Sequence, residues 1–236
     1  MTHHRALLAL AVTASLALAS GCADTTAQTT PEATTKATPE AARAFVERVN
    51  QEYKTLYPEV AAAQWVSVTY INDDTQLLAS KANERSLTRL NEYIEESKKF
   101  AGLELDAETA RALALLKLQT SMPAPKDPAK LAELTQIATR MEGMYGAGEY
   151  CTGEGDAKSC RQLGELENVL RDSRDYDAQL DAWQGWRTIS QPMRKDYTRF
   201  VELVNKGADE MGFTDAGEMW RSAYDMSPVE IAAETD

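Results

Sequence analysis

The sequence predicts an all-α protein, and three observations lead to this prediction. Apolar residues recur at intervals of three and four over most of the chain, which is typical of amphipathic helices. β-branched runs with a period of two, which would indicate strands, are nearly absent. The 12 glycines gather outside these helical patterns, where they end helices and form loops. We therefore expect one helical domain over residues 38–236.

The chain is acidic, with 37 Asp and Glu residues against 25 Lys and Arg residues and a net charge of -12. A surface of this sign repels a phosphate backbone, so a nucleic-acid partner is not expected. Solubility alone would favour the same acidity. The hydrophobic content of 43% and the charged content of 26% are those of an ordinary globular domain.

Residues 1–21 have the layout of a secretory signal peptide: a basic start, an apolar stretch and small residues before Cys22. The apolar stretch is too short to span a bilayer comfortably. Residues 18–22 (Leu-Ala-Ser-Gly-Cys) resemble a bacterial lipobox, in which the cysteine is lipidated; ordinary cleavage near the same point is the alternative. We expect an exported protein, held by a lipid anchor in the bacterial envelope on its periplasmic or outer-membrane face. Residues 22–37 are expected to form a flexible tether, because they contain no large apolar residue.

Three cysteines leave an odd thiol in an exported protein, and lipidation of Cys22 would remove it. Cys151 and Cys160 then remain as a pair, separated by a polar, glycine-bearing segment that can turn back on itself. On the oxidising side of a membrane we expect them to form a disulfide. Because the enclosed loop is short, the bond would contribute about 2 to 3 kcal/mol. Metal binding by the two cysteines is the competing interpretation, although no histidine follows His4 to complete such a site.

The first helix is expected to begin at Thr38 and Pro39, where a capping hydroxyl precedes a proline at the first helical position. Its apolar face has residues spaced four, four and three apart: Phe45, Val49, Tyr53 and Leu56. Pro58 lies within this pattern, so we expect a kink or a break there, with helix continuing over residues 59–70.

Three more helices are expected before the cysteine pair. Asn72 and the two aspartates after it predict the start of one that extends to Phe100 and ends at Gly102. Asp106 predicts the start of the next, to about Gln119, and its leucines occupy several faces, so we expect it to be the most buried helix. The third has an apolar face in register: Leu131, Leu134, Ile137, Met141 and Tyr145.

The C-terminal part predicts one or two helices over 165–186, broken near Ser173, and one clean amphipathic helix over 190–211. Asp215 is expected to cap a short helix. Residues 227–230 (Ser-Pro-Val-Glu) form a capping box that starts a last helix. Because the sequence stops six residues later, we expect a truncated chain; a frayed natural tail is the alternative.

Three segments carry a resemblance to a known family. The most specific is 183–187 (Trp-Gln-Gly-Trp-Arg), which is similar to a family stretch of tryptophan, any residue, glycine, tryptophan and arginine. The second is 215–224, where Asp-Ala-Gly is followed by Trp-Arg-Ser and a tyrosine. The third is 141–145, Met-Glu followed by a tyrosine, ahead of the cysteine pair. Taken in their order along the chain, 141–145, 183–187 and 215–224, they resemble the angiotensin-converting enzymes and their bacterial peptidyl-dipeptidase relatives.

The resemblance implies roles for particular positions. Glu142 corresponds to a glutamate that lines the family's peptide groove. A second acidic groove position aligns either with Gly164 or, after a one-residue gap, with Glu165. Arg187 corresponds to an arginine at a buried chloride site, and Tyr224 to a tyrosine at a second chloride site. For each residue the plainer alternative is a packing or solvent-facing position on a helix.

The resemblance also implies a half-domain that forms the lid, around Trp65, and one wall of a deep groove for oligopeptides. The family's reaction releases a C-terminal dipeptide and needs a zinc ion held by two histidines of an H-E-x-x-H helix and a downstream glutamate. This sequence contains only His3 and His4, both within the predicted signal peptide. We therefore expect the chain alone to be inactive, with the zinc ligands in a missing C-terminal half of the same domain. The alternatives are a non-catalytic helical envelope lipoprotein that binds peptides or a partner protein, and a structural envelope protein.

Overall fold

The protein is described by a computed structural model for residues 37–235. Over this range it is helical apart from one two-stranded hairpin, which confirms the predicted all-α class. The predicted signal peptide, Cys22 and nearly all of the predicted tether lie outside the described residues and remain predictions. Among the helices of residues 37–235, none has both the length and the apolar character needed to cross a membrane.

Helices account for most elements along the chain, and the two strands lie near its middle. In sequence order the elements are α1 (Pro39–Thr69), α2 (Asp73–Ser97), α3 (Ala107–Leu116), α4 (Pro128–Gly146), β1 (Glu149–Thr152), β2 (Ser159–Gln162), α5 (Leu163–Asp172), α6 (Tyr176–Ser190), α7 (Arg194–Glu210), α8 (Ala216–Arg221) and α9 (Pro228–Thr235). Short 3-10 turns follow α2 at Lys98–Phe100, precede α7 at Gln191–Met193 and follow α8 at Ser222–Tyr224.

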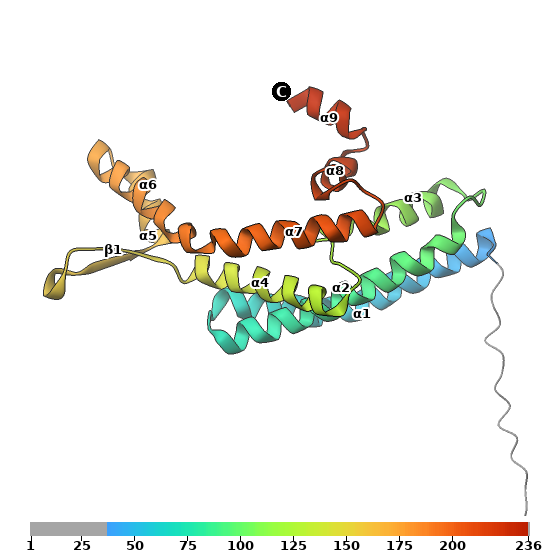
Figure 1. The fold of residues 1–236 in the computed structure, drawn as a ribbon, viewed down its shortest axis with the longest axis horizontal. Helices are drawn as coiled ribbons and strands as arrows, with labels where there is room; N and C mark the ends of the chain where they lie inside the picture. Colours follow the sequence, from blue (N-terminus) through green and yellow to red (C-terminus); the bar gives the residue numbers. More distant parts are fainter. Residues whose placement is uncertain (1–36, 236) are drawn as a thin grey trace, which may run out of the picture. The chain divides into compact units, whose positions relative to one another are not determined.

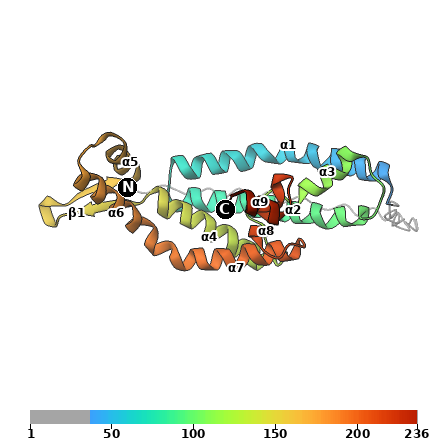
Figure 2. The same cartoon turned by 90° about the horizontal axis from the view of Figure 1, so that it is seen from above.

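The four long helices pack in the order α1, α2, α4, α7, each against the next (Figures 1 and 2). The main hydrophobic core lies between them, and its most buried members include Leu134, Leu203 and Tyr93. Helix α3 packs on α1 and α2. The hairpin, α5 and α6 gather at one end of α4 and α7, around a smaller core of Leu166, Ala182 and Ile189 (Figure 2).

The helix starts predicted from capping residues are confirmed, and in each the side chain accepts a hydrogen bond from a first-turn amide. Thr38 accepts a hydrogen bond from the amide of Ala41, with Pro39 at the first helical position. Asn72 forms a reciprocal capping box with Thr75. The other predicted caps that accept a first-turn amide are Asp106, Asp215 and Ser227.

A kink or a break was expected at Pro58, and the break is wrong, since α1 continues through this proline as one helix of 31 residues. A proline inside a helix removes one amide donor and crowds the preceding turn. Pro58 lies on the exposed side of α1, where that loss is open to water. The stretches on both sides of it pack against α2, so tertiary contacts outweigh the local cost.

The expectation that the helix after Asp106 is the most buried is also wrong. Only Thr109 and Leu116 are buried in α3, and Leu115 is 37% exposed. The leucines do occupy several faces of the helix, but among the described elements α3 packs chiefly on α1 and α2. Its remaining apolar surface therefore faces outward.

The hairpin was not predicted as a pair of strands. β1 and β2 are antiparallel, with Cys151 directly opposite Cys160, and the predicted disulfide between these two cysteines is confirmed. Each strand has only four residues, and most of them are exposed, so no alternation of apolar and polar residues could reveal it. Metal binding by the two cysteines is excluded, because their sulfurs are bonded to each other.

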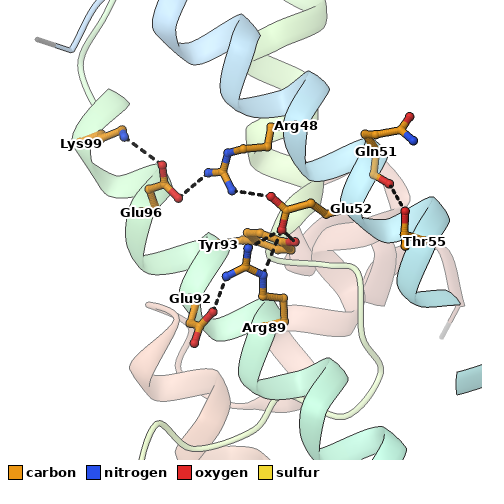
Figure 3. Close-up of polar contacts among 9 residues, drawn as sticks. All are labelled: Arg48, Gln51, Glu52, Thr55, Arg89, Glu92, Tyr93, Glu96 and Lys99. Carbon is orange, nitrogen blue, oxygen red and sulfur yellow. Dashed lines mark hydrogen bonds and ion pairs between the residues drawn. The ribbon is translucent and has the colours of Figure 1, made fainter. Parts of the chain in front are cut away.

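Helices α1 and α2 are joined by a ladder of charges centred on Glu52 (Figure 3). Arg48 donates to Glu52 at 2.9 Å and to Glu96 at 2.5 Å. Arg89 donates to the same Glu52 carboxylate, which also accepts a 2.5 Å bond from the hydroxyl of Tyr93. One carboxylate on α1 thus binds two residues of α2, which fixes how the two helices lie against each other.

Candidate functional site

A groove of about 1170 Å³ is lined by residues from all four long helices. These four helices pack in the order α1, α2, α4, α7, and each contributes three or four of the lining residues. Residues 119–122, which precede α4, complete it together with Ser190 at the end of α6 and with Gln191 and Met193 before α7. The α1 stretch that lines it ends at Val60, and Trp65, which we expected in a lid over the groove, is 69% exposed and does not line it.

Eight of the 21 lining residues have aromatic or sulfur-containing side chains. They are Tyr53, Tyr57, Tyr145, Tyr197, Phe200, Met122, Met141 and Met193. Tyr57 and Tyr197 are 68% and 61% exposed, so their rings and hydroxyls are open to a ligand. Binding sites for organic ligands commonly combine such apolar walls with a few polar groups. Flexible methionine side chains adapt to ligands of varied shape.

Glu142 lies on α4 and lines the groove, where the resemblance led us to expect it. Its carboxyl is reached by solvent, yet the surrounding walls displace enough water for burial to raise its pKa above the ordinary value of 4.5. Its contact with a bound peptide remains a prediction. A carboxylate in this position can accept hydrogen bonds from a ligand's amides or pair with a cationic group.

The position of Glu142 opposite α7 follows from ion pairs on the other face of the two helices. Arg140 donates two hydrogen bonds, of 2.8 and 2.9 Å, to Asp196, and Arg199 donates two of the same lengths to Glu133. These bonds set α4 and α7 antiparallel and in register. Glu142 follows Arg140 by two residues, and Arg194 precedes Asp196 by two. Because a helix rotates about 100° per residue, a step of two residues leads to the opposite side of each helix. There Glu142 and Arg194 both line the groove.

One end of the groove is supported by segment 183–187. The indole N–H of Trp186 donates a 2.7 Å hydrogen bond to the hydroxyl of Tyr145, a groove-lining residue. Gly185 faces Tyr150 of the hairpin so closely that a Cβ there would overlap the tyrosine ring. The hydroxyl of Tyr150 in turn donates a 2.8 Å bond to Asp181. The glycine of this motif therefore lets the hairpin approach α6.

The structure places the remaining predicted site residues outside this groove. Glu165 belongs to the capping box of α5, where its carboxylate accepts a 2.8 Å bond from the amide of Gln162. Arg187 is exposed, and its guanidinium lies 3.8 Å from the ring centroid of Trp183. Tyr224 is 64% exposed, in the turn after α8. Their roles in substrate or chloride binding stay predictions.

The described residues do not fit a zinc ion. In residues 37–235 the one group of potential ligands is Glu149, Cys151 and Cys160, and the two sulfurs of this group form the disulfide. Zinc requires deprotonated thiolates, neutral imidazoles or carboxylates as ligands, and no histidine occurs in this range.

Reasoning from the sequence missed Arg194 and Tyr57 as groove residues. A signal for Arg194 was present, because it stands three residues before Tyr197 and seven before Val201, on the side of α7 that carries apolar residues. A charged residue at such a position breaks the amphipathic pattern, and such exceptions are expected at functional sites.

The fold and the groove define an all-α protein with a large, aromatic-lined concavity that contains one carboxylate and one guanidinium. The family model described as angiotensin-converting enzyme matches residues 36–235. The chain belongs to the angiotensin-converting enzyme family, whose members are zinc-dependent metallopeptidases. This confirms the resemblance inferred from segments 141–145, 183–187 and 215–224.

Individual relatives agree with the family model. The angiotensin-converting enzyme of Mus musculus is 32% identical over 192 residues, which cover 80% of this chain and 14% of that protein. The angiotensin-converting enzyme of Bos taurus is 29% identical over 189 residues, 79% of this chain and 14% of the relative. That of Mesocricetus auratus is 30% identical over 191 residues, again 80% and 14%. The chain thus spans about 14% of the length of these relatives.

Proposed function

We propose that this chain forms one wall of the peptide groove of a peptidyl dipeptidase, which removes dipeptides from the C-terminus of oligopeptides. The observation that carries the proposal is the groove between α1, α2, α4 and α7, lined by exposed tyrosines and by Glu142. Family membership supports a peptide as the ligand. Apolar and aromatic walls would accept side chains, and tyrosine hydroxyls and the carboxylate would bind backbone amides.

We propose that residues outside this sequence carry out the hydrolysis. The family requires zinc, and the donor set of residues 37–235 does not fit this metal. We propose that the C-terminal half of the same domain supplies the zinc ligands and is the partner of this chain. The chain alone would then bind peptides without cleaving them.

Peptide binding is tested with acetyl-Ala-Leu-Gln-Phe-Ala, free at its C-terminus, by isothermal titration calorimetry on the purified chain. We expect binding that weakens by about tenfold in Tyr57→Ala, because an exposed ring of the groove is removed. Tyr176→Ala is the matched control, since Tyr176 is 74% exposed on α6 and does not line the groove. Absence of binding, or equal effects of the two substitutions, would overturn the proposal for the groove.

Cleavage is tested on the same peptide by mass spectrometry, with and without added zinc. We expect no Phe-Ala product. Release of Phe-Ala that depends on stoichiometric zinc would show that this chain carries a metal site of its own. Peptide binding without cleavage, even after the C-terminal half is added, would favour the alternative of a non-catalytic peptide-binding lipoprotein.

Two further proposals complete the assignment. We propose that the protein is exported and anchored in the bacterial envelope through lipid on Cys22, as residues 18–22 indicate. Cys22→Ser should abolish metabolic labelling with palmitate and release the protein from the membrane fraction.

We also propose chloride binding at Arg187 and Tyr224 once the domain is complete. Loss of chloride dependence in Arg187→Gln would support that role, and unchanged dependence would contradict it.

A further inference from the structure

Arg194 differs from its neighbours on α4 and α7 because its guanidinium has no partner among residues 37–235. Arg140 and Arg199, on the outer face of the same helix pair, each bind a carboxylate with two hydrogen bonds. Of the arginines in residues 37–235, only Arg194 and Arg221 make no side-chain hydrogen bond and no ion pair. Only Arg194 of these two lines the groove.

The groove holds one charge of each sign among its described lining residues, Glu142 on α4 and Arg194 on α7. The register of the two helices sets these residues across from each other, yet they form no ion pair with one another. Both groups are therefore available to a ligand.

The surroundings of Arg194 suit a carboxylate. The guanidinium presents a planar fork of donors that matches a carboxylate in a two-bond arrangement. Met193 and Tyr197, its neighbours in the lining, provide largely apolar surface. Arg194 is itself exposed, so a carboxylate of a ligand in the groove can reach its guanidinium.

We propose that Arg194 binds a carboxylate of the peptide in the groove and so makes the site selective for peptides that carry one there. This inference rests on the proposed function and adds a specificity-determining residue to it. The carboxylate is that of an acidic side chain or that of the C-terminus. The two sources share the chemistry that Arg194 recognises, and a set of three peptides separates them.

The three peptides have the same length and acetylated N-termini. The first is Ala-Leu-Gln-Phe-Ala with an amidated C-terminus, which carries no carboxylate. The second replaces Gln by Glu, and the third keeps Gln but has a free C-terminus. We expect the second or the third to bind about tenfold more tightly than the first, as one charge-assisted contact would give. Arg194→Gln should remove that difference, so that the three peptides bind this variant with similar affinities.

Lys195→Gln is the matched control, because Lys195 is the next residue of α7 but lies with Arg140 and Asp196 on the outer face. It should leave all three affinities unchanged. If Lys195→Gln reduces the preference as much as Arg194→Gln does, the effect is one of net charge and the inference is wrong. Equal binding of the three peptides to the unaltered chain overturns the role of Arg194 but leaves the groove function intact. Failure of all three peptides to bind overturns the proposed function itself.

Discussion

The indole N–H of Trp186 donates a 2.7 Å hydrogen bond to the hydroxyl of Tyr145, and this bond ties α6 to the last turn of α4. Because Tyr145 lines the groove, the bond also holds one side of the candidate site. Trp186→Phe keeps the apolar contacts and removes the donor. We expect a loss of about 1 kcal/mol in the free energy of unfolding, measured in urea, and weaker peptide binding.

Trp183 provides the control for this prediction. It is 49% exposed, and its indole N–H makes no hydrogen bond to any residue in 37–235. Trp183→Phe should change the free energy of unfolding by less than about 0.5 kcal/mol. If the two tryptophan substitutions have the same effect, the bond to Tyr145 does not support the groove.

Gly185→Ala is expected to destabilise the protein by about 1 to 3 kcal/mol, the usual range for overpacking. The added methyl group would overlap the ring of Tyr150, and that ring cannot move aside without losing the 2.8 Å bond from its hydroxyl to Asp181. Gly164→Ala is the contrasting variant, because a Cβ at Gly164 in α5 meets open space. It should stabilise α5 by about 0.5 to 1 kcal/mol. Thermal unfolding followed by circular dichroism measures the stability of both variants. Melting temperatures that shift in the same direction would show that the hairpin moves away from the added methyl group at little energetic cost.

The charge ladder between α1 and α2 predicts a pH dependence. Hydrogen bonds from Tyr93, Arg89 and Arg48 lower the pKa of Glu52 to about 2. A carboxyl group whose pKa falls on folding stabilises the folded chain at pH values above its pKa in the unfolded chain, which is near 4.5. This stabilisation is lost as the pH falls toward the pKa in the folded chain. Because the site is partly exposed, we expect Glu52→Gln to cost about 1 kcal/mol at pH 7 after solvent screening.

The loss in Glu52→Gln should shrink between about pH 5 and pH 2, because over that range the unfolded chain binds a proton at Glu52 while the folded chain keeps this carboxylate ionised until near its own pKa. Glu47→Gln is the control: it removes the same charge from α1 at an exposed residue that makes no ion pair within residues 37–235. Urea unfolding at several pH values measures both. A pH-independent difference between Glu52→Gln and the unaltered chain would contradict the role given to the ladder.

The helix starts could be predicted from the sequence because residues close together in the chain determine them. Thr38, Asn72 and Asp215 each bond an amide three residues away, so the residues that decide these starts are neighbours in the chain. Pro58 and the leucines of α3 show the opposite case. Whether a proline breaks a helix, and which side of a helix is covered, depends on partners distant in sequence, which periodicity does not identify.

The candidate site was predictable only in part. Glu142 was found through the family resemblance, because nothing in its local pattern separates it from a solvent-facing glutamate. Arg194 was missed, because its significance comes from facing Glu142 across two helices whose register is set by Arg140 and Asp196. Glu165 was expected near the same groove, but its place at the start of α5 gives it a capping bond instead.

The disulfide should stabilise the hairpin more than the helical body. Cys151 and Cys160 are nine residues apart, and a loop of this length predicts a contribution of about 2 to 3 kcal/mol from chain entropy. Reduction with dithiothreitol should therefore increase hydrogen exchange in β1, β2 and α6, because β1 contacts both of the other elements. Exchange in α1 and α2 should stay unchanged. Equal acceleration throughout residues 37–235 would show that the bond holds the whole fold.

Glu142→Gln and Glu165→Gln are expected to change stability in opposite directions. Burial raises the pKa of Glu142, so its ionised form costs stability above that pKa, and the cost disappears as the pH falls below the unfolded value. Glu142→Gln should therefore be more stable than the unaltered chain at pH 7, by less than about 1 kcal/mol because solvent reaches the group, and equally stable near pH 4. Glu165→Gln should lose about 0.5 kcal/mol at pH 7, because a charged cap favours a helix start.

A carboxylate retained where it reduces stability is typical of a binding site, since function and stability often compete at such residues. Glu142→Gln should accordingly bind acetyl-Ala-Leu-Gln-Phe-Ala less tightly while it unfolds at a higher urea concentration. Glu165→Gln tests the second groove position that the resemblance implies: because Glu165 does not line this groove, unchanged affinity for the peptide would contradict that role and weaker binding would support it. If Glu142→Gln gains stability without losing affinity, the carboxylate of Glu142 belongs to the solvated surface. The tyrosines and Arg194 would then be the groups that recognise the peptide.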